Sequence, residues 1–336
     1  MKVFIPYERK SSKGSYESAR LRKTLKGECE LASVEWVDSF LACPDIAHLT
    51  SLEEEPLLID AKWRRIPCVV SAFYSENDKR GAFLEKERKG TPKVSAKAVK
   101  FLNSADLVLV PNEMMRNVCL SSGVTSPIRV HPASIRLDRF AASSPEAGIF
   151  PRYYGVRNGD KIVVSTGEYE DKDTMKILVA VAKACPEIQF YFFGSTRRPG
   201  LKIRLAVGQR HAPKNLHFKP LVQDDVYRSA LICAGAYLSL NSQRCESVAL
   251  LEAMAAKAQI IALYNHFYEP LIKDGETAWV AMHFEEVITY LRSLYSPNKK
   301  STIIAGWQLA KSRGIDSASK DLYAIYSELL QKKPTN

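Results

Sequence analysis

The sequence lacks several features that would define its class at once. No apolar run reaches the roughly 20 residues of a membrane-spanning helix, and the apolar part of the N-terminal MKVFIPYERK is too short for a signal peptide. The seven cysteines are scattered without a CxxC pair, and the six histidines are dispersed. Neither a disulfide framework nor a zinc site is therefore indicated. These absences are typical of a cytoplasmic protein with reduced thiols.

The composition is that of an ordinary soluble chain with an excess of positive charge. The 336 residues are enough for two domains, and 46% of them are hydrophobic and 25% charged. The net charge of +11 favours an anionic partner, which could be a nucleic acid, a membrane surface or a phosphorylated substrate. The same charge could also serve solubility alone.

Predicted strands and helices alternate along the first part of the chain. The expected strands are 2–7, 45–50, 67–73, 106–111 and 127–132, and the expected helices are 17–27, 53–65, 95–105 and 112–123. Strands separated by helices indicate a parallel sheet. Residues 141–160 are rich in Ala, Ser, Pro and Gly, as linkers are, and the alternation then restarts with a strand at 161–167. The pattern predicts an α/β protein with two doubly wound parallel-sheet domains in tandem.

One stretch in the second domain, RCESVALLEAMAAK at 244–257, places a carboxylate inside an otherwise apolar helix. Ser247 can cap the helix, which lies between the predicted strands 236–240 and 260–263. The loop before it lies at the carboxyl end of a strand, where doubly wound sheets bind ligands. Glu252 is therefore either a ligand-binding group or a residue on a solvent-facing edge of the helix.

The order of these segments resembles the GT-B glycosyltransferases of family 4, most closely the small bacterial enzymes that glucosylate diacylglycerol. The similarity is carried by KGSYES, DLVLVPNEMMRNVCLSSGVTSPIRV, SIRLDRF, IQFYFFGS and SVALLEAMAAKAQIIAL. It implies a GT-B fold with two Rossmann-like domains. The implied division is an acceptor and membrane domain at 1–145, a linker at 146–160, a nucleotide-sugar domain at 161–305, and helices at 306–336 that pack back on the first domain.

By the same resemblance, Glu252 matches the second Glu of an E-x7-E motif and would bind the ribose hydroxyls of the donor. The first Glu of the motif falls on Arg244, with Glu246 nearby as a possible replacement, and Ser247 stands where the family usually has Gly. A cationic pair that grips the diphosphate is expected near 165–174. Its Arg position is Glu168, and only Lys172 lies close to the Lys position.

The remaining donor residues implied by the resemblance lie in loops. They are Gly14 and Ser15 after the first strand, Gly194, Ser195 and Arg197 after the FFG strand, and Val222 beside the base. The basic loop around Arg197 is equally consistent with a solvated turn. The family uses no bound metal, so no metal and no cofactor are expected. The reaction would retain the anomeric configuration and needs no protein base; the catalytic residues are not identified.

The acceptor side is expected in the first domain. Residues 79–100 contain eight Lys/Arg and two Glu, with Phe83 and Leu84 between them. This composition fits either a solvated helix and loop or a surface for anionic lipid. The resemblance favours the second, with Phe83 and Leu84 inserting and Lys86, Arg88, Lys89 and Lys93 contacting headgroups.

The sequence therefore predicts a metal-independent hexosyltransferase that uses a UDP-sugar, UDP-glucose or UDP-galactose, and a lipid acceptor such as diacylglycerol. It would be peripheral on the cytoplasmic face of the membrane. A soluble or cell-wall acceptor and a catalytically silent GT-B partner protein stay open as alternatives. A nucleic-acid partner is not expected, since no aromatic-basic module is recognisable.

Overall fold

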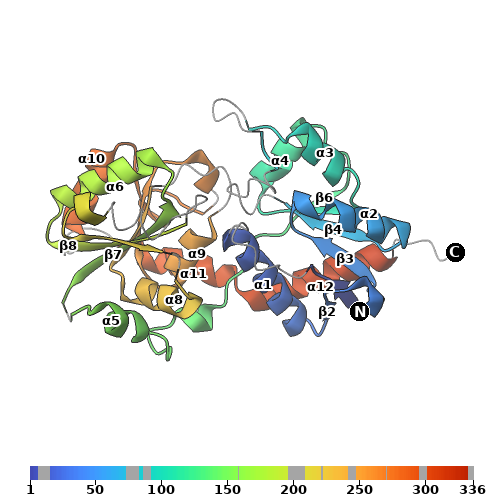
Figure 1. Cartoon of the computed structure of the whole chain (residues 1–336), viewed down its shortest axis with the longest axis horizontal. Coiled ribbons are helices and arrows are strands. Elements are labelled where there is room, and N and C mark those ends of the chain that lie inside the picture. The colour runs from blue at the N-terminus through green and yellow to red at the C-terminus, as the bar shows by residue number, and fades with distance from the viewer. Residues whose placement is uncertain are drawn as a thin grey trace. The chain divides into compact units, whose positions relative to one another are not determined.

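The computed structural model describes residues 1–6, 16–72, 83–85, 92–157, 159–195, 209–220, 222–240, 247–269, 271–294 and 301–331, with backbone only for 16–20 and 195. The chain divides into two compact units (Figure 1). Unit 1 comprises residues 1–134 and 313–336, and unit 2 comprises 135–243 and 247–312.

Unit 1 is built on a six-stranded parallel sheet in the order β2-β1-β3-β4-β5-β6. The strands are β1 Lys2–Phe4, β2 Glu35–Val37, β3 Ile46–Leu49, β4 Cys68–Ser71, β5 Leu107–Val110 and β6 Ile128–Val130. β3 and β4 are buried along their whole length, which is why they read as continuous apolar runs. β2 was not predicted from the sequence, because it is a short edge strand whose three residues are exposed or half-buried.

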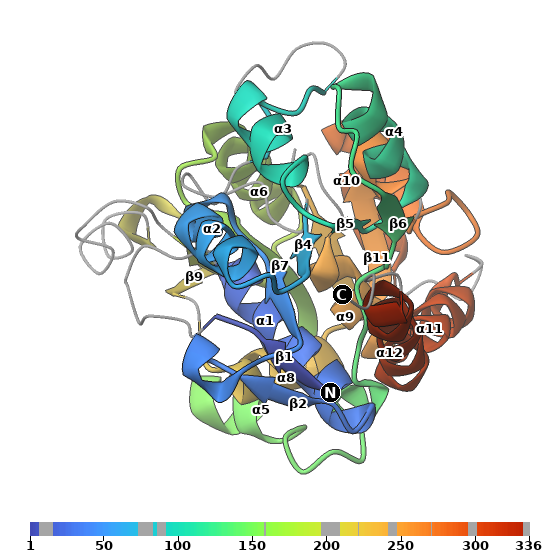
Figure 2. The same ribbon diagram turned by 90° about the vertical axis from the view of Figure 1, so that its right-hand side faces the viewer.

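Helices cover both faces of this sheet. They are α1 Tyr16–Leu31, α2 Glu55–Trp63, α3 Ala96–Leu102, α4 Glu113–Ser121 and α12 Ile315–Gln331, with short 3₁₀ turns η1 Phe40–Ala42 and η2 Leu52–Glu54. α1 and α12 pack together over one face, and α2 and α12 lie on opposite sides of the strands (Figure 2). Inside, His48 bridges Tyr326 Oη of α12 at 2.6 Å and Ser71 Oγ of β4 at 2.7 Å. The C-terminal helix is thus tied into the core of unit 1.

Unit 2 has a second six-stranded parallel sheet, in the order β12-β11-β10-β7-β8-β9. Its strands are β7 Lys161–Glu168, β8 Ile188–Ser195, β9 Leu216–Pro220, β10 Ala236–Ser239, β11 Gln259–Leu263 and β12 Trp279–Ala281. Its helices are α5 Ile149–Tyr154, α6 Lys172–Ala184, α8 Asp224–Cys233, α9 Val248–Ala255, α10 Phe284–Ser293 and α11 Ile303–Ser312, with 3₁₀ turns η3 Leu137–Phe140 and η4 His266–Tyr268. Both sheets have the doubly wound topology, so the predicted fold class is confirmed.

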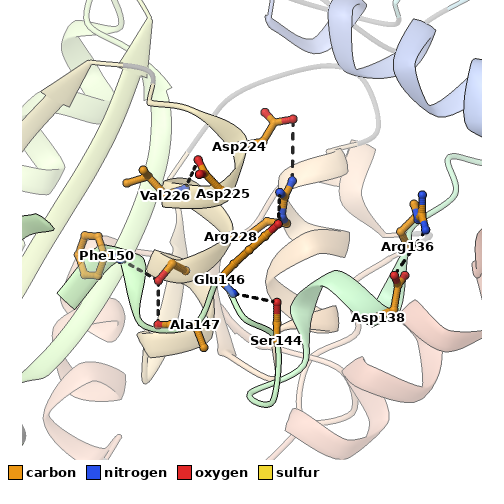
Figure 3. Close-up of polar contacts among 11 residues, drawn as sticks. Arg136, Asp138, Ser144, Glu146, Ala147, Phe150, Asp224, Asp225, Val226 and Arg228 are labelled. Carbon is orange, nitrogen blue, oxygen red and sulfur yellow. Dashed lines mark hydrogen bonds and ion pairs between the residues drawn. The ribbon is translucent and has the colours of Figure 1, made fainter. Parts of the chain in front are cut away.

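The segment expected to be a linker is a packed part of unit 2. Glu146 accepts two hydrogen bonds from the guanidinium of Arg228 on α8, at 2.5 and 2.8 Å. Ser229 Oγ donates to Ala147 O and accepts from Phe150 N, both at 2.8 Å (Figure 3). The composition of 141–160 suggested a linker, but these contacts and the helix α5 fix the segment against α8. The chain leaves unit 1 at residue 134, before the predicted boundary at 145.

The two C-terminal helices belong to different units. α12 packs against α1 in unit 1, whereas α11 packs against α9 in unit 2. Gly306 permits the second contact, because a Cβ there would lie 3.3 Å from Thr277 O and 3.4 Å from Met254 Cγ. Both helices were predicted to pack on the first domain. The sequence does not distinguish them, because each has an apolar face and neither is followed by a strand.

Candidate functional site

The strand order of unit 2 reverses between β7 and β10. Strands run outward from β7 through β8 to β9, and outward from β10 through β11 to β12. At such a switch point the loops on either side diverge, and doubly wound sheets bind their ligands in the resulting crevice at the carboxyl ends of the strands. Thr174 Oγ1 in α6 donates to Leu240 O at the end of β10, 3.0 Å away. The start of α6 is therefore fixed beside the end of β10.

On the β10 side of the switch point, α9 begins at Ser247. The Ser247 side chain is buried and its Oγ accepts a hydrogen bond from Leu250 N at 3.4 Å, as the capping pattern predicts. Leu250 and Leu251 anchor the helix in the core. Glu252 is half-buried rather than in the core, and its negative charge acts on Arg228 of the neighbouring α8.

On the β7 side, the turn into α6 carries the two positions at which the resemblance expects an Arg and a Lys that hold the diphosphate. Glu168 is the last residue of β7, and Lys172 is the exposed first residue of α6. Asp171 caps the helix by accepting from Thr174 N at 3.1 Å. Because α6 directly follows β7, Lys172 in its first turn lies at the carboxyl edge of the sheet.

Gly194 lies at the end of β8, where it makes room for an aromatic ring from the β7 turn. A Cβ at this position would lie 2.5 Å from the Tyr169 ring and 2.7 Å from Phe192. The Tyr169 hydroxyl donates to Lys219 O of β9 at 2.6 Å. Tyr169 therefore joins the ends of three adjacent strands, and Gly194 is required by this close packing.

The β9–α8 connection supplies the remaining predicted contact. Val222 is half-buried just after β9 and packs against the core that contains α8 and α9. Arg228 of α8 extends between Glu146 and Asp224 (Figure 3). Its guanidinium lies 3.9 Å from the carboxylate of Asp224. Burial opposes the charge of Arg228, but the Glu146 hydrogen bonds and nearby carboxylates, Glu252 included, raise its pKa. The Arg228 hydrogen bond in turn lowers the pKa of Glu146.

The structure therefore brings Glu252, Ser247, Lys172, Gly194 and Val222 to one edge of the unit 2 sheet. For Ser195 the described part is its backbone, which ends β8. The predicted residues Arg244, Glu246, Arg197, Gly14 and Ser15 lie outside the residues that the structure describes.

Sequence reasoning missed three residues that shape this edge, Tyr169, Thr174 and Arg228. An Asp-x-x-Thr pattern at the start of α6 could have indicated the cap on Thr174. The pairing of Arg228 with Asp224, four residues earlier in α8, is a local contact that the sequence could have indicated. The contacts of Tyr169 with Lys219 and of Arg228 with Glu146 could not be predicted locally, because these partners lie far away along the chain.

The expected insertion of Phe83 and Leu84 into a membrane is wrong in this structure. Phe83 is 4% exposed and Leu84 8% exposed. Leu84 forms a bridge with Val94, and the Phe83 ring lies 6.4 Å from that of Phe101. Their apolar surface is used inside unit 1, against α3. Lys93 is exposed as expected, while Lys86, Arg88 and Lys89 lie outside the described part of the chain.

The described residues show neither a membrane-spanning helix nor a metal site. No helix among them is both long enough and apolar enough to cross a bilayer. Within the same ranges, no three His, Cys, Asp or Glu side chains are grouped so that they could hold a metal ion.

Comparison with known proteins finds a distant relative in sequence. No protein-family profile matches the chain. The processive diacylglycerol alpha-glucosyltransferase of Acholeplasma laidlawii is 19% identical over 230 residues, which cover 68% of this chain and 69% of the relative.

Several solved structures match the fold over nearly the whole chain. The Anabaena protein HepE in complex with UDP-glucose superposes with a TM-score of 0.73 at 13% identity, covering 98% of this chain and 100% of that one. Sucrose-phosphate synthase from Thermosynechococcus elongatus gives 0.67 at 13% identity, with 93% and 78% covered. These similarities confirm the GT-B fold and the resemblance to family-4 glycosyltransferases, as a distant homology.

Proposed function

We propose that this GT-B protein is a hexosyltransferase that moves a sugar from a UDP-sugar donor to a membrane lipid such as diacylglycerol, with retention of anomeric configuration. The distant relative is named for that activity. The Anabaena neighbour has been solved with UDP-glucose. UDP-glucose is accordingly the first donor to test and UDP-galactose the second.

The observation that carries the proposal is the position of Glu252. It lies in the second turn of α9, which starts at the switch point of the unit 2 sheet, and it is half-buried in a helix whose other residues are mostly core. A carboxylate accepts two hydroxyl hydrogen bonds, and its charge strengthens each of them. Glu252 is therefore proposed as the ligand of the ribose hydroxyls.

The leaving diphosphate gains negative charge in the transition state, so the site must supply donors or cations there. We assign this role to the N-terminus of α9, whose backbone N–H groups and dipole favour an anion, and to the ammonium group of Lys172. No metal ion is needed in this scheme. The enzyme would work at the cytoplasmic face of the membrane, where UDP-sugars and the lipid acceptor meet.

Calorimetric titration with a panel of UDP-sugars tests the donor site. Glu252→Ala should weaken UDP-glucose binding by about 1–3 kcal/mol, because two hydrogen bonds to a charged acceptor are lost. Glu285→Ala, which removes an exposed carboxylate from α10 of the same unit, is the matched control and should bind normally. If the wild type binds the donor and both variants bind it equally well, Glu252 is not the ribose ligand.

A second candidate, a catalytically silent GT-B protein that binds a glycan or a partner enzyme, is favoured by one feature. Glu168 ends β7 where the resemblance expects an Arg, so a negative charge stands where a phosphate would need a cation. Incubation with radiolabelled UDP-glucose and diacylglycerol vesicles separates the two. Absence of donor binding together with absence of labelled lipid would favour the silent protein, whereas labelled lipid would establish the transferase.

A further inference from the structure

The two most exposed large apolar side chains that the structure describes lie in unit 1, on η1 and α2, and a third exposed one lies on α2. Leu41 is 88% exposed, Trp63 81% and Ile59 61%. Leu58 and Ala61 of the same helix are buried, so α2 places one face in the core and turns Ile59 and Trp63 outward. Burial of Phe83 and Leu84 removes the apolar element that the sequence suggested for a membrane contact, and these three residues are exposed instead.

The two elements that carry these three residues are in contact. Ile59 and Trp63 are four residues apart in α2 and therefore lie one above the other. The guanidinium of Arg64, next to Trp63, lies 5.6 Å from the centroid of the Phe40 ring, next to Leu41. We call Leu41, Ile59 and Trp63 the α2–η1 patch.

Basic side chains border this patch. Lys62, Arg64 and Arg65 are all exposed beside Trp63. The two carboxylates of α2 are each matched by a base, since Asp60 pairs with Arg64 at 2.9 Å and Glu55 with Lys97 of α3 at 3.6 Å. The region thus presents more positive than negative charge around exposed apolar groups.

We propose that the α2–η1 patch is the surface by which the protein binds an anionic lipid bilayer. Trp is favoured at the level of lipid headgroups because its ring is large and apolar but carries one N–H donor. Lys and Arg can lay their aliphatic stems on the apolar zone while their charges meet lipid phosphates. The proposal rests on the lipid acceptor assigned above, since a protein that modifies a bilayer lipid must reach the bilayer.

Vesicle flotation tests the patch with the 336-residue chain. The variant with Leu41→Ser, Ile59→Ser and Trp63→Ser should bind vesicles of phosphatidylglycerol and phosphatidylcholine about tenfold or more weakly than wild type, because the apolar contribution to interfacial binding is lost. Tyr153→Ser with Ile304→Ser is the matched control. These residues are 70% and 72% exposed in unit 2 and should not affect flotation. Equal flotation of the triple variant and wild type would overturn the proposal.

Trp63 itself supplies a second measurement that does not depend on the folding of the triple serine variant. With Trp36, Trp279 and Trp307 replaced by Phe, its fluorescence should shift to the blue and be quenched by brominated lipid when vesicles are added. Absence of both changes while the protein floats would show that another surface makes the contact. A concentration-dependent shift without lipid, matched by dimerisation in ultracentrifugation, would instead assign the patch to a second copy of the chain.

Donor titration keeps this inference separate from the function it rests on. If the triple variant binds UDP-glucose like wild type but no longer floats, the patch is the membrane surface of a functional donor-binding protein. If wild type binds UDP-glucose and never floats, the patch and the lipid acceptor both fail and a soluble acceptor is favoured. If wild type floats through the patch but binds no UDP-sugar, the surface stands and the proposed transferase does not.

Discussion

The Glu146–Arg228 pair should help to hold residues 135–148 against the rest of unit 2. Arg228→Met removes both hydrogen bonds that Glu146 accepts, at 2.5 and 2.8 Å, and keeps much of the side-chain volume. Glu146→Gln removes the charge and keeps the shape. Each variant should destabilise unit 2, and the double variant should be less destabilised than the sum of the two.

The exposure of the two side chains sets the size of the effect. The side chain of Arg228 is 11% exposed and that of Glu146 26% exposed, so the pair lies between surface and interior. Exposed ion pairs contribute about 0–1 kcal/mol, and breaking a buried one costs about 3–5 kcal/mol. Asp224 at 3.9 Å partly compensates Arg228 when Glu146 is changed. We therefore expect a coupling energy of about 1–2 kcal/mol at neutral pH.

A double-mutant cycle in urea measures this energy. With Trp36 and Trp63 replaced by Phe, the fluorescence of Trp279 and Trp307 reports the unfolding of unit 2. The exposed pair Arg136 and Asp138, at 3.5 Å with side chains 48% and 68% exposed, is the control and should give below about 0.5 kcal/mol.

The pH dependence of the coupling follows from the lowered pKa of Glu146. The contribution is present above the ordinary carboxyl pKa of 4.5 and is lost as the pH falls through the lower pKa of the folded state. A coupling no larger than that of the control pair, or one unchanged in acid, would refute the reasoning.

Three further outcomes are expected. Gly194→Ala should destabilise unit 2 by about 1–3 kcal/mol in the same urea assay, because its Cβ would meet the Tyr169 ring at 2.5 Å; full stability would show that the ring moves at no cost. Burial opposes the charge of His131, but its bonds to Asp321 and Glu28 raise its pKa to about 9. Stability should therefore be full below the unfolded pKa of 6.5 and decline as the pH rises through about 9, by at most about 1.4 kcal/mol per pH unit, and His131→Gln should abolish that slope. Transferase activity should survive EDTA, and loss of turnover restored by Mg²⁺ or Mn²⁺ would show that the diphosphate is held by a metal instead.

The sequence by itself determined the fold class and the place of the candidate ligand edge. Apolar strands such as 106–111 and 236–240, separated by helices, indicate a parallel doubly wound sheet. In such a sheet the ligand-binding loops lie at the carboxyl ends of the strands. The capping serine and the carboxylate in 244–257 were readable because capping and helical periodicity act over a few neighbouring residues.

Tertiary structure decided the features that depend on partners distant along the chain. Residues 141–160 have the composition of a linker, yet Glu146 and Ala147 are held by side chains about 80 residues later. Phe83 and Leu84 stand among Lys and Arg in the sequence, yet they are buried, because the strand bridge to Val94 and the contact with α3 turn them inward. The composition of a segment shows that it contains apolar side chains but not whether they are buried. The packing of the whole unit decides which of them, such as Trp63, stay exposed to another partner.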